Sequence, residues 1–399
     1  MARKRSIVGA ALCVAGLAGP AVLARAAGAD GAGLGSPWVV TLGDSYISGE
    51  AGRWAGNTNT SSASVDALGA TAYWDTPTGE AIAGCHRSAS AEAFIGTASG
   101  ANLACSGARS ATDASGSSFK PGLDFYLDGA ARKGQARLLQ ELATGHRVGM
   151  VVVSVGGNDF GFASIVQQCV TDFLLSPSWW PNYCNDDASV RAHFTAANVA
   201  TQTTAIRAAL ANVQQAMAGA GYTTAQWTLL VQTYPSPLPP GGGIRYRQSG
   251  FTRQSTGGCG FWNADASWAN TTALATINGA VRGAAATAGP NVKVLELQSA
   301  LDGRRLCEGT VGRLEERGLA SWRSADAVDQ TEWVDQIRTV TAVFGPYQVQ
   351  ESIHPNHWGQ LALRSCVRQA WNGGFPRGGT CTIAGPGRNA AGEPLMTLG

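Results

Sequence analysis

The stretch that decides the fold reads WVVTLGDSYISGE and runs from Trp38 to Glu50. It begins with a short apolar, β-branched run, which predicts a buried strand. The strand ends in Gly-Asp-Ser, so its carboxyl end should present the hydroxyl of Ser45 at a turn. Ligands of open α/β sheets bind beyond the carboxyl ends of the strands. Ser45 is therefore a candidate nucleophile; the alternative is an ordinary strand-to-helix turn with Ser45 as the helix cap.

The residues before this stretch have the pattern of an export signal. A basic start at Arg3–Arg5 precedes an apolar segment at Ile7–Leu23, and small residues follow. We expect residues 1–29 to be a signal peptide that is cleaved near residues 26–29, and the mature chain to be secreted. The apolar segment is short and contains Pro20, which argues against a retained membrane anchor.

Cleavage of that segment would change the formal charge of the chain from +2 to about −2. The basic character of the precursor therefore comes from the leader and does not indicate a nucleic-acid partner. The chain also has no Lys/Arg run that could form a basic patch. We expect no nucleic acid among its partners.

The cysteine pattern suits an oxidising compartment. Cys13 lies in the leader, and the eight that remain are an even number, as expected of disulfides in an exported chain. No Cys-x-x-Cys pair occurs, so we expect no zinc site and no other metal. Many connectivities are possible, and we expect nearest neighbours to pair. The expected bridges are Cys85–Cys105, Cys169–Cys184, Cys259–Cys307 and Cys366–Cys381.

Strand and helix patterns alternate along the chain, which predicts a parallel sheet with helices on both faces. Five strands are expected near residues 38, 102, 148, 227 and 292, and helices at about 90–97, 134–145, 188–218, 263–286 and 356–371. Stretches near 51–99, 234–262 and 300–350 are interpreted as insertions into a single domain of residues 37–385, with a C-terminal tail at 386–399.

Three strand ends carry residues that suit ester cleavage by a serine. Ser45, Gly107 and Asn158 each follow a predicted strand, so they should meet at one edge of the sheet. Before the last helix, His354 can take the proton of the hydroxyl and Glu351 can orient the imidazole. The N–H groups of Ser45 and Gly107 and the side-chain amide of Asn158 can form an oxyanion hole.

Together these motifs resemble the SGNH branch of the GDSL hydrolases, and specifically the secreted actinobacterial lipases and esterases. The family's four marked residues fall on Ser45 in Gly-Asp-Ser, Gly107 in Ala-Cys-Ser-Gly, Asn158 in Gly-Gly-Asn-Asp and His354 in His-Pro-Asn. The resemblance implies a three-layer α/β/α, flavodoxin-like fold with strand order 2-1-3-4-5. It also implies a serine esterase without a cofactor that forms an acyl-enzyme, with lipid esters as substrates of a lipase, phospholipase or lysophospholipase. We expect a monomer that contacts lipid surfaces transiently.

The chain departs from the family pattern at two positions. Tyr46 stands where the family name implies Leu, and Glu351 stands where the family usually has Asp, three residues before the histidine. Some secreted relatives orient the histidine with a backbone carbonyl instead. Glu351 and a carbonyl therefore both remain candidates for that role.

Several other side chains have simpler explanations than catalysis. His357 could compete as the base, but we expect it on the helix surface or in the pocket wall. Asp44 and Asp159 should fix turns or support loops. The other histidines are expected at the surface: His86, His146 and His193. Tryptophans in or beside the insertions could line an acyl groove, form an interfacial lip or fill small apolar cores: Trp179, Trp180, Trp262, Trp268, Trp322 and Trp333.

Two alternative functions remain open at this stage. The first is a carbohydrate esterase that removes acetyl groups from a polysaccharide, since one fold serves several substrates. The second, of a different class, is a secreted binding protein with a vestigial hydrolase site.

Overall fold

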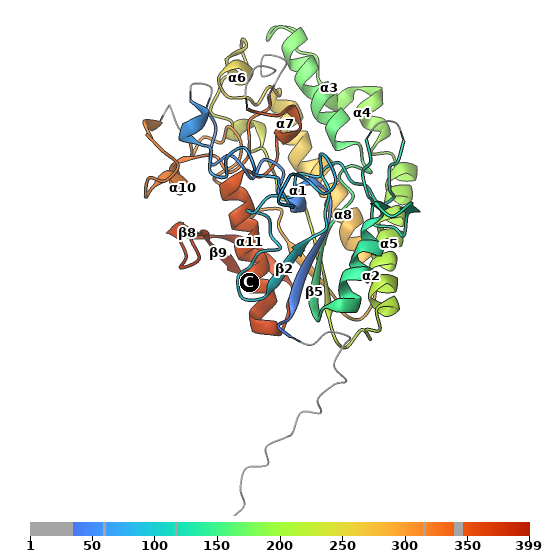
Figure 1. Ribbon diagram of the computed structural model, residues 1–399. Helices are drawn as coiled ribbons and strands as arrows, with labels where there is room; N and C mark the ends of the chain where they lie inside the picture. The colour runs from blue at the N-terminus through green and yellow to red at the C-terminus, as the bar shows by residue number, and fades with distance from the viewer. Residues whose placement is uncertain (1–34, 59–60, 116–117, 314–316, 339–345) are drawn as a thin grey trace, which may run out of the picture. The chain divides into compact units, whose positions relative to one another are not determined.

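A mostly parallel sheet organises the chain, as Figure 1 shows for this computed structural model. The structure describes residues 35–58, 61–115, 118–313, 317–338 and 346–399, all within the unit Gly31–Gly399. The predicted signal peptide at residues 1–29 lies outside the described residues.

The sheet has seven strands in the order β2-β1-β5-β6-β7-β8-β9. The strands are β1 (Trp38–Gly43), β2 (Ser99–Asn102), β5 (Val148–Ser154), β6 (Thr228–Gln232), β7 (Val292–Glu296), β8 (Gly379–Arg388) and β9 (Pro394–Leu398). The first five are the predicted strands; they run parallel, and their order is the expected 2-1-3-4-5. A separate hairpin joins β3 (Leu127–Asp128) to β4 (Arg132–Lys133).

Residues 386–399 are not the tail that the sequence suggested. They belong to the β8–β9 hairpin, in which β9 pairs antiparallel with β8 and β8 pairs parallel with β7. The glycines and Pro386 within β8 hide its strand pattern in the sequence. The pairing with β7 and the disulfide from Cys381 to Cys366 in the last helix stabilise a strand that the local sequence does not favour.

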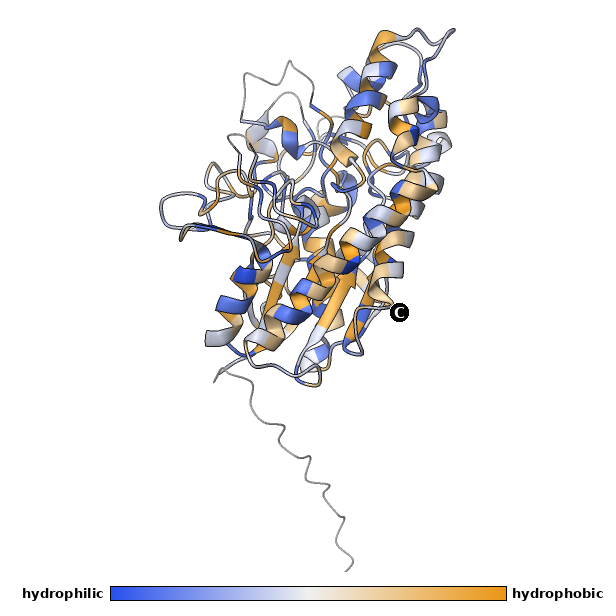
Figure 2. Ribbon diagram, turned by 90° about the vertical axis from the view of Figure 1, so that its right-hand side faces the viewer, coloured by the Kyte–Doolittle hydropathy of each residue, from blue (hydrophilic) through white to orange (hydrophobic). Residues whose placement is uncertain are grey.

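Helices cover both faces of the sheet, so the predicted three-layer α/β/α fold is confirmed (Figure 2). Alternate residues of a strand point to opposite faces. Val40 and Leu42 face α2 (Gln135–Gly145), α5 (Ala196–Gly219) and α8 (Leu274–Ala285), whereas Val39 belongs to the core that includes α11 (His357–Trp371).

Most predicted helices are present, with two differences. The segment at 263–286 is α7 (Asn263–Trp268), a π-helical turn (Ala269–Ala273) and α8. The segment at 188–218 is divided into α4 (Ala188–Ala192) and α5. The division occurs where the side chain of Thr195 caps α5 by accepting from the N–H of Asn198 at 3.3 Å.

The predicted helix at 90–97 is wrong, because this segment consists of turns. The guanidinium of Arg364 in α11 donates to the carbonyls of Ala89 and Ala91, at 2.5 and 3.1 Å, and so occupies acceptors near the start of such a helix. In contrast, α3 (Phe162–Leu175) was not predicted.

The remaining helices are short. They are α1 (Ser45–Ser48), α6 (Thr252–Ser255), α10 (Ala327–Gln330) and the 3-10 turns Ser62–Ser64, Cys184–Asp186, Gly241–Gly243, Val349–Glu351 and Asn372–Gly374. No helix in the described part of the chain is both long and apolar enough to cross a bilayer.

Four disulfides join the cysteines in the pairs expected from the sequence, Cys85–Cys105, Cys169–Cys184, Cys259–Cys307 and Cys366–Cys381. The first attaches the insertion after β1 to the turn that follows β2. The second closes the loop after α3. The bridges therefore hold irregular segments against the sheet and its helices.

Candidate active site

Ser45 lies where β1 passes into α1, at the carboxyl edge of the sheet. Gly43 has a φ of +138°, and a Cβ there would stand 1.9 Å from the carbonyl oxygen of Ser154, so only glycine fits this turn. The helix cap is Asp44, whose carboxylate accepts from the N–H of Tyr46 at 3.1 Å. Because Asp44 is the cap, the alternative role of Ser45 as a cap is excluded.

Asp44 and Asp159 both support backbone turns, as predicted. The second carboxylate oxygen of Asp44 accepts from the hydroxyl of Tyr234 at 2.5 Å. Burial raises the pKa of Asp44 to about 7, although the bond from Tyr234 opposes the shift. Asp159 accepts from the N–H of Ser110 at 3.1 and 3.2 Å, and burial raises its pKa as well.

His354 contacts the serine directly. Its Nε2 atom lies 2.7 Å from Oγ of Ser45, and its Nδ1 atom lies 3.0 Å from the carbonyl oxygen of Ser352. A carbonyl can only accept, so Nδ1 carries the proton and Nε2 is free to accept from the hydroxyl. Burial lowers the pKa of His354, while the negative charge of Glu50 opposes that shift. The imidazole is thus arranged as a neutral base.

Glu351 does not orient the imidazole, and that prediction is wrong for this structure. Its carboxylate accepts from the hydroxyl of Tyr73 at 2.5 Å, from the indole N–H of Trp54 at 2.9 Å and from the N–H of Gln348 at 2.8 Å. The 3-10 turn Val349–Glu351 directs the side chain into the insertion. The backbone alternative is the one observed.

The chain before His354 has an unusual conformation. Ile353 has a φ of +61°, which is rare for a β-branched residue. Its carbonyl accepts from the hydroxyl of Tyr46 at 3.0 Å, and its N–H donates to the carbonyl of Asp335 at 3.0 Å. The ring of Tyr46 also lies 5.1 Å from that of His354, between centroids. Tyr46 thus helps to hold the histidine.

The three candidate oxyanion donors line one cavity of about 880 Å³ together with Ser45 and His354. Gly107 has a φ of +81°, and the side-chain amide of Asn158 donates to the carbonyl of Ala108 at 2.9 Å. The N–H groups of Ser45 and Gly107 make no hydrogen bond to any other described residue. Donors left unpaired beside a candidate nucleophile suit an oxyanion.

A buried pair near the site was missed by the sequence analysis. His86, expected at the surface, is buried, and its Nδ1 atom lies 2.7 Å from the carboxylate of Glu50. Burial lowers the pKa of His86, but the hydrogen bond and charge of Glu50, with the charges of Glu80 and Glu351, together leave it raised. Burial raises the pKa of Glu50, but the hydrogen bond and charge of His86, with His354 and Ser106, together leave it lowered. Gln350 in the cavity wall lies 2.8 Å from the same nitrogen. No local motif signals this pair, because its members come from separate loops.

The other histidines do not reach Ser45. His357 is buried between Trp322 and Trp358 and lies 3.3 Å from the carbonyl of Gly52, so it is neither on the surface nor in the cavity wall. Burial lowers the pKa of His357 to about 4. As predicted, His146 is exposed, whereas His193 is half-buried.

The tryptophans of the insertions lie in different environments. Trp333 is buried in the large core on the α11 side of the sheet, Trp262 is buried against Phe173, and Trp268 lines an apolar pocket of about 70 Å³ beside the site. Trp179 and Trp180 are exposed beyond α3. Within the described ranges, no group of three or more His, Cys, Asp or Glu side chains is arranged to hold a metal ion.

The fold defines the chain as an α/β protein with a mostly parallel sheet flanked by helices. No protein-family model matches the sequence, and no curated protein matches it. The chain is similar to the crystal structures of an extracellular lipase from Streptomyces rimosus and a phospholipase A1 from Streptomyces albidoflavus NA297. The lipase is 18% identical, with a TM-score of 0.41, over 84% of this chain and 100% of the other. The phospholipase is 18% identical, with a TM-score of 0.40, over 84% of this chain and 99% of the other.

Proposed function

We propose that the chain is a serine hydrolase of carboxylic esters, with Ser45 as the nucleophile and His354 as the base. The observation that carries the proposal is the 2.7 Å contact between Nε2 of His354 and Oγ of Ser45, at a cavity that also presents two unpaired N–H groups. A vestigial site in a binding protein would have no need to keep the imidazole in this tautomer.

The proposed reaction needs only side chains, backbone groups and water. Nε2 of His354 takes the proton of Ser45 as Oγ attacks the ester carbonyl, and the oxyanion is held by the donors of Ser45, Gly107 and Asn158. Collapse of the tetrahedral intermediate breaks the bond between the acyl carbon and the alcohol oxygen, and the alcohol leaves with the proton from His354. Water then attacks the acyl-enzyme with His354 as base, and the acid leaves as the proton returns to Oγ.

The cavity wall favours a lipid ester, acted on by a lipase, phospholipase or lysophospholipase. The wall formed by α3 contains an apolar series, Phe162, Val166, Val170 and Leu174, in the same cavity as Ser45, with Gln167 and Thr171 as the polar side chains beside it. A hydrocarbon chain would gain free energy from that surface, whereas a polysaccharide would leave it unused. The four disulfides favour an exported protein, and we propose that the enzyme is secreted and acts as a monomer.

Wild type and Ser45→Ala, assayed on p-nitrophenyl butyrate, test the chemistry. We expect the variant to lose kcat by about 10⁴-fold or more, because residual catalysis without the nucleophile is small. Equal activity in the two proteins would refute the proposal. A panel of triglyceride, phospholipid, lysophospholipid and acetylated xylan then tests the substrate class, and turnover of acetylated xylan alone would replace the lipid assignment with carbohydrate esterase.

A further inference from the structure

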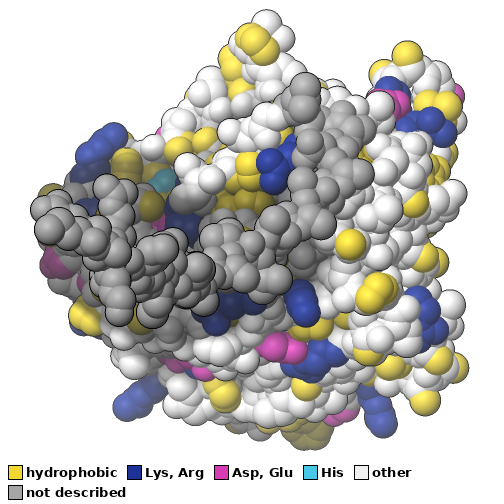
Figure 3. Space-filling view, turned by 90° about the horizontal axis from the view of Figure 1, so that it is seen from below, with side chains coloured by type: hydrophobic (Ala, Val, Ile, Leu, Met, Phe, Trp, Pro, Cys, Tyr) yellow, Lys and Arg dark blue, Asp and Glu magenta, His cyan; other side chains and the backbone are white. Residues whose placement is uncertain are grey.

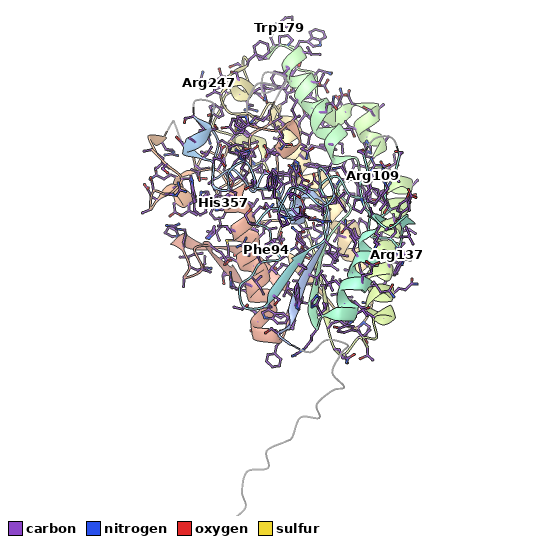
Figure 4. All side chains as sticks on the ribbon, viewed as in Figure 1. Phe94, Arg109, Arg137, Trp179, Arg247 and His357 are labelled. Carbon is purple, nitrogen blue, oxygen red and sulfur yellow. A yellow bond between two sulfur atoms is a disulfide. The ribbon has the colours of Figure 1, made fainter. Side chains whose placement is uncertain are left out.

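Three large apolar side chains are displayed to solvent at the end of α3. Leu175, Trp179 and Trp180 are 82%, 80% and 74% exposed. We call residues 175–181 the tryptophan tip; Figure 4 shows Trp179 at the outer end of α3, away from the sheet. Exposed tryptophans in such proximity are rarely left without a partner.

The tip is braced, so its exposure is a feature of the fold. The disulfide Cys169–Cys184 closes the loop that carries it. The amide of Asn182 donates to Asp172 at 2.8 Å, and its N–H donates to Oγ of Ser176 at 2.9 Å. The rings of Trp179 and Trp180 meet edge to face, with their centroids 6.5 Å apart.

One side of α3 connects the tip to the candidate active site. Phe162, whose ring lies 6.2 Å from that of His354, begins a series at four-residue spacing that continues with Val166, Val170 and Leu174, all in the cavity wall. A helix of this length spans about 20 Å. The hydrocarbon of one bilayer leaflet is about 15 Å thick, so the series is long enough to accompany one acyl chain.

The chemistry of the tip identifies its partner. Tryptophan favours the boundary between lipid and water, because its ring is apolar and its N–H is polar. Residues 175–183 contain no charged side chain, so this segment cannot bind a membrane through attraction to anionic headgroups. Val349, 59% exposed, adds an apolar side chain in the wall of the same cavity.

We propose that the tryptophan tip inserts into the surface of a zwitterionic lipid aggregate, and that the apolar series on α3 guides one acyl chain from that surface to Ser45. The guiding step rests on the proposed function; the docking of the tip does not. The partner of the tip is a lipid surface. The experiment below distinguishes binding to that surface from self-association of the chain through the tip.

Binding is measured on Ser45→Ala, which cannot consume the lipid, by cosedimentation with phosphatidylcholine vesicles. We expect Trp179→Ser/Trp180→Ser in this background to weaken partitioning at least tenfold, with little change between low and high salt. The matched control is Phe375→Ser. Phe375 is 61% exposed but follows the end of α11, where Trp371 lies against Gly149 at the start of β5, on the opposite edge of the sheet. Figure 3 shows that face, where charged side chains of both signs appear among apolar ones.

Equal vesicle binding by the tip variant and the control would overturn the proposal, as would binding that high salt abolishes. If the Ser45→Ala parent is a dimer that does not bind vesicles, and the tip variant is a monomer, the tip would serve self-association instead. In the active protein, the tip variant should lose at least tenfold more activity on vesicle phospholipid than on soluble p-nitrophenyl butyrate. Vesicle binding without any ester hydrolysis would leave the docking in place and refute the proposed function, so the two failures are distinguishable.

Discussion

At the scale of single residues, the arrangement behind His354 differs from a carboxylate-based triad. The carbonyl of Ser352 accepts from the imidazole, and Glu351 is engaged by Trp54 and Tyr73. We therefore expect Glu351→Gln to keep kcat/KM on a soluble ester within about threefold, while thermal unfolding shows a loss of about 1–3 kcal/mol from the buried hydrogen bonds. A hundredfold loss of kcat with unchanged stability would instead show that Glu351 takes part in catalysis.

Tyr46 should matter for activity more than for folding. Its hydroxyl holds the carbonyl of Ile353, whose backbone conformation sets the direction of His354. We expect Tyr46→Phe to lower kcat by about three- to tenfold with little change in KM, because one positioning hydrogen bond is worth about 1 kcal/mol. Tyr73→Phe, which removes a hydroxyl from the Glu351 cluster, is the control for a general loss of a buried bond. Equal effects on kcat in the two variants would contradict a positioning role for Tyr46.

The pKa of His354 predicts the pH dependence of the reaction. Burial lowers this pKa below its ordinary value, and the proposed mechanism uses the neutral imidazole as the base. Activity should therefore be complete at pH 7 and decline only on acidification below the usual range of histidine, near pH 6.5. The pH profile of kcat/KM measures this, and a midpoint above pH 7 would be inconsistent with the buried, carbonyl-bonded ring.

At the scale of elements, the prediction from sequence was accurate where one segment carries a complete pattern. The strands β1, β5 and β6 are largely apolar runs, and α2 and α11 have one apolar side and recognisable ends. The segment at 90–97 has helix-forming residues, yet Arg364 from α11 occupies its carbonyls. The β8–β9 hairpin was missed because β8 contains glycine and proline, which disfavour a strand. In the folded protein, the pairing of β8 with β7 and β9 stabilises it nevertheless.

The hairpin permits a direct test of the predicted tail. Met396 and Leu398 of β9 are buried, and the buried carboxylate of Glu393 is bound by Arg368 of α11. Deletion of residues 389–399 should therefore lower the free energy of unfolding by about 3 kcal/mol or more, through lost apolar burial and an uncompensated arginine. Denaturant unfolding measures this change. Deletion of Gly399 alone is the control, and a truncated protein as stable as wild type would restore the tail interpretation.

At the scale of the whole molecule, His357 links folding to pH. The ring is buried among tryptophans, and burial lowers its pKa to about 4. Because the unfolded chain binds the proton near pH 6.5 and the folded chain does not, this group destabilises the fold as pH falls from 6.5 toward 4. We expect His357→Gln to be less stable than wild type at pH 8, and the difference to shrink by about 2–3 kcal/mol at pH 4.5. Parallel denaturation curves at the two pH values check this, and a constant difference would contradict it.

The sequence by itself determined the α/β class and the places of the five central strands, and it singled out Ser45, Gly107, Asn158 and His354 as candidates. These features depend on local patterns: apolar runs, a glycine turn, and the rule that parallel strands end at one edge. The order of the strands was implied by the resemblance to a known family and not by those patterns. Only the tertiary structure decided what stands behind His354, that His86 is buried against Glu50, and that Trp179 and Trp180 are exposed while Trp262 and Trp333 are not. Each of these depends on which distant segments meet, and the irregular insertions that bring them together have no periodicity from which the contact could be inferred.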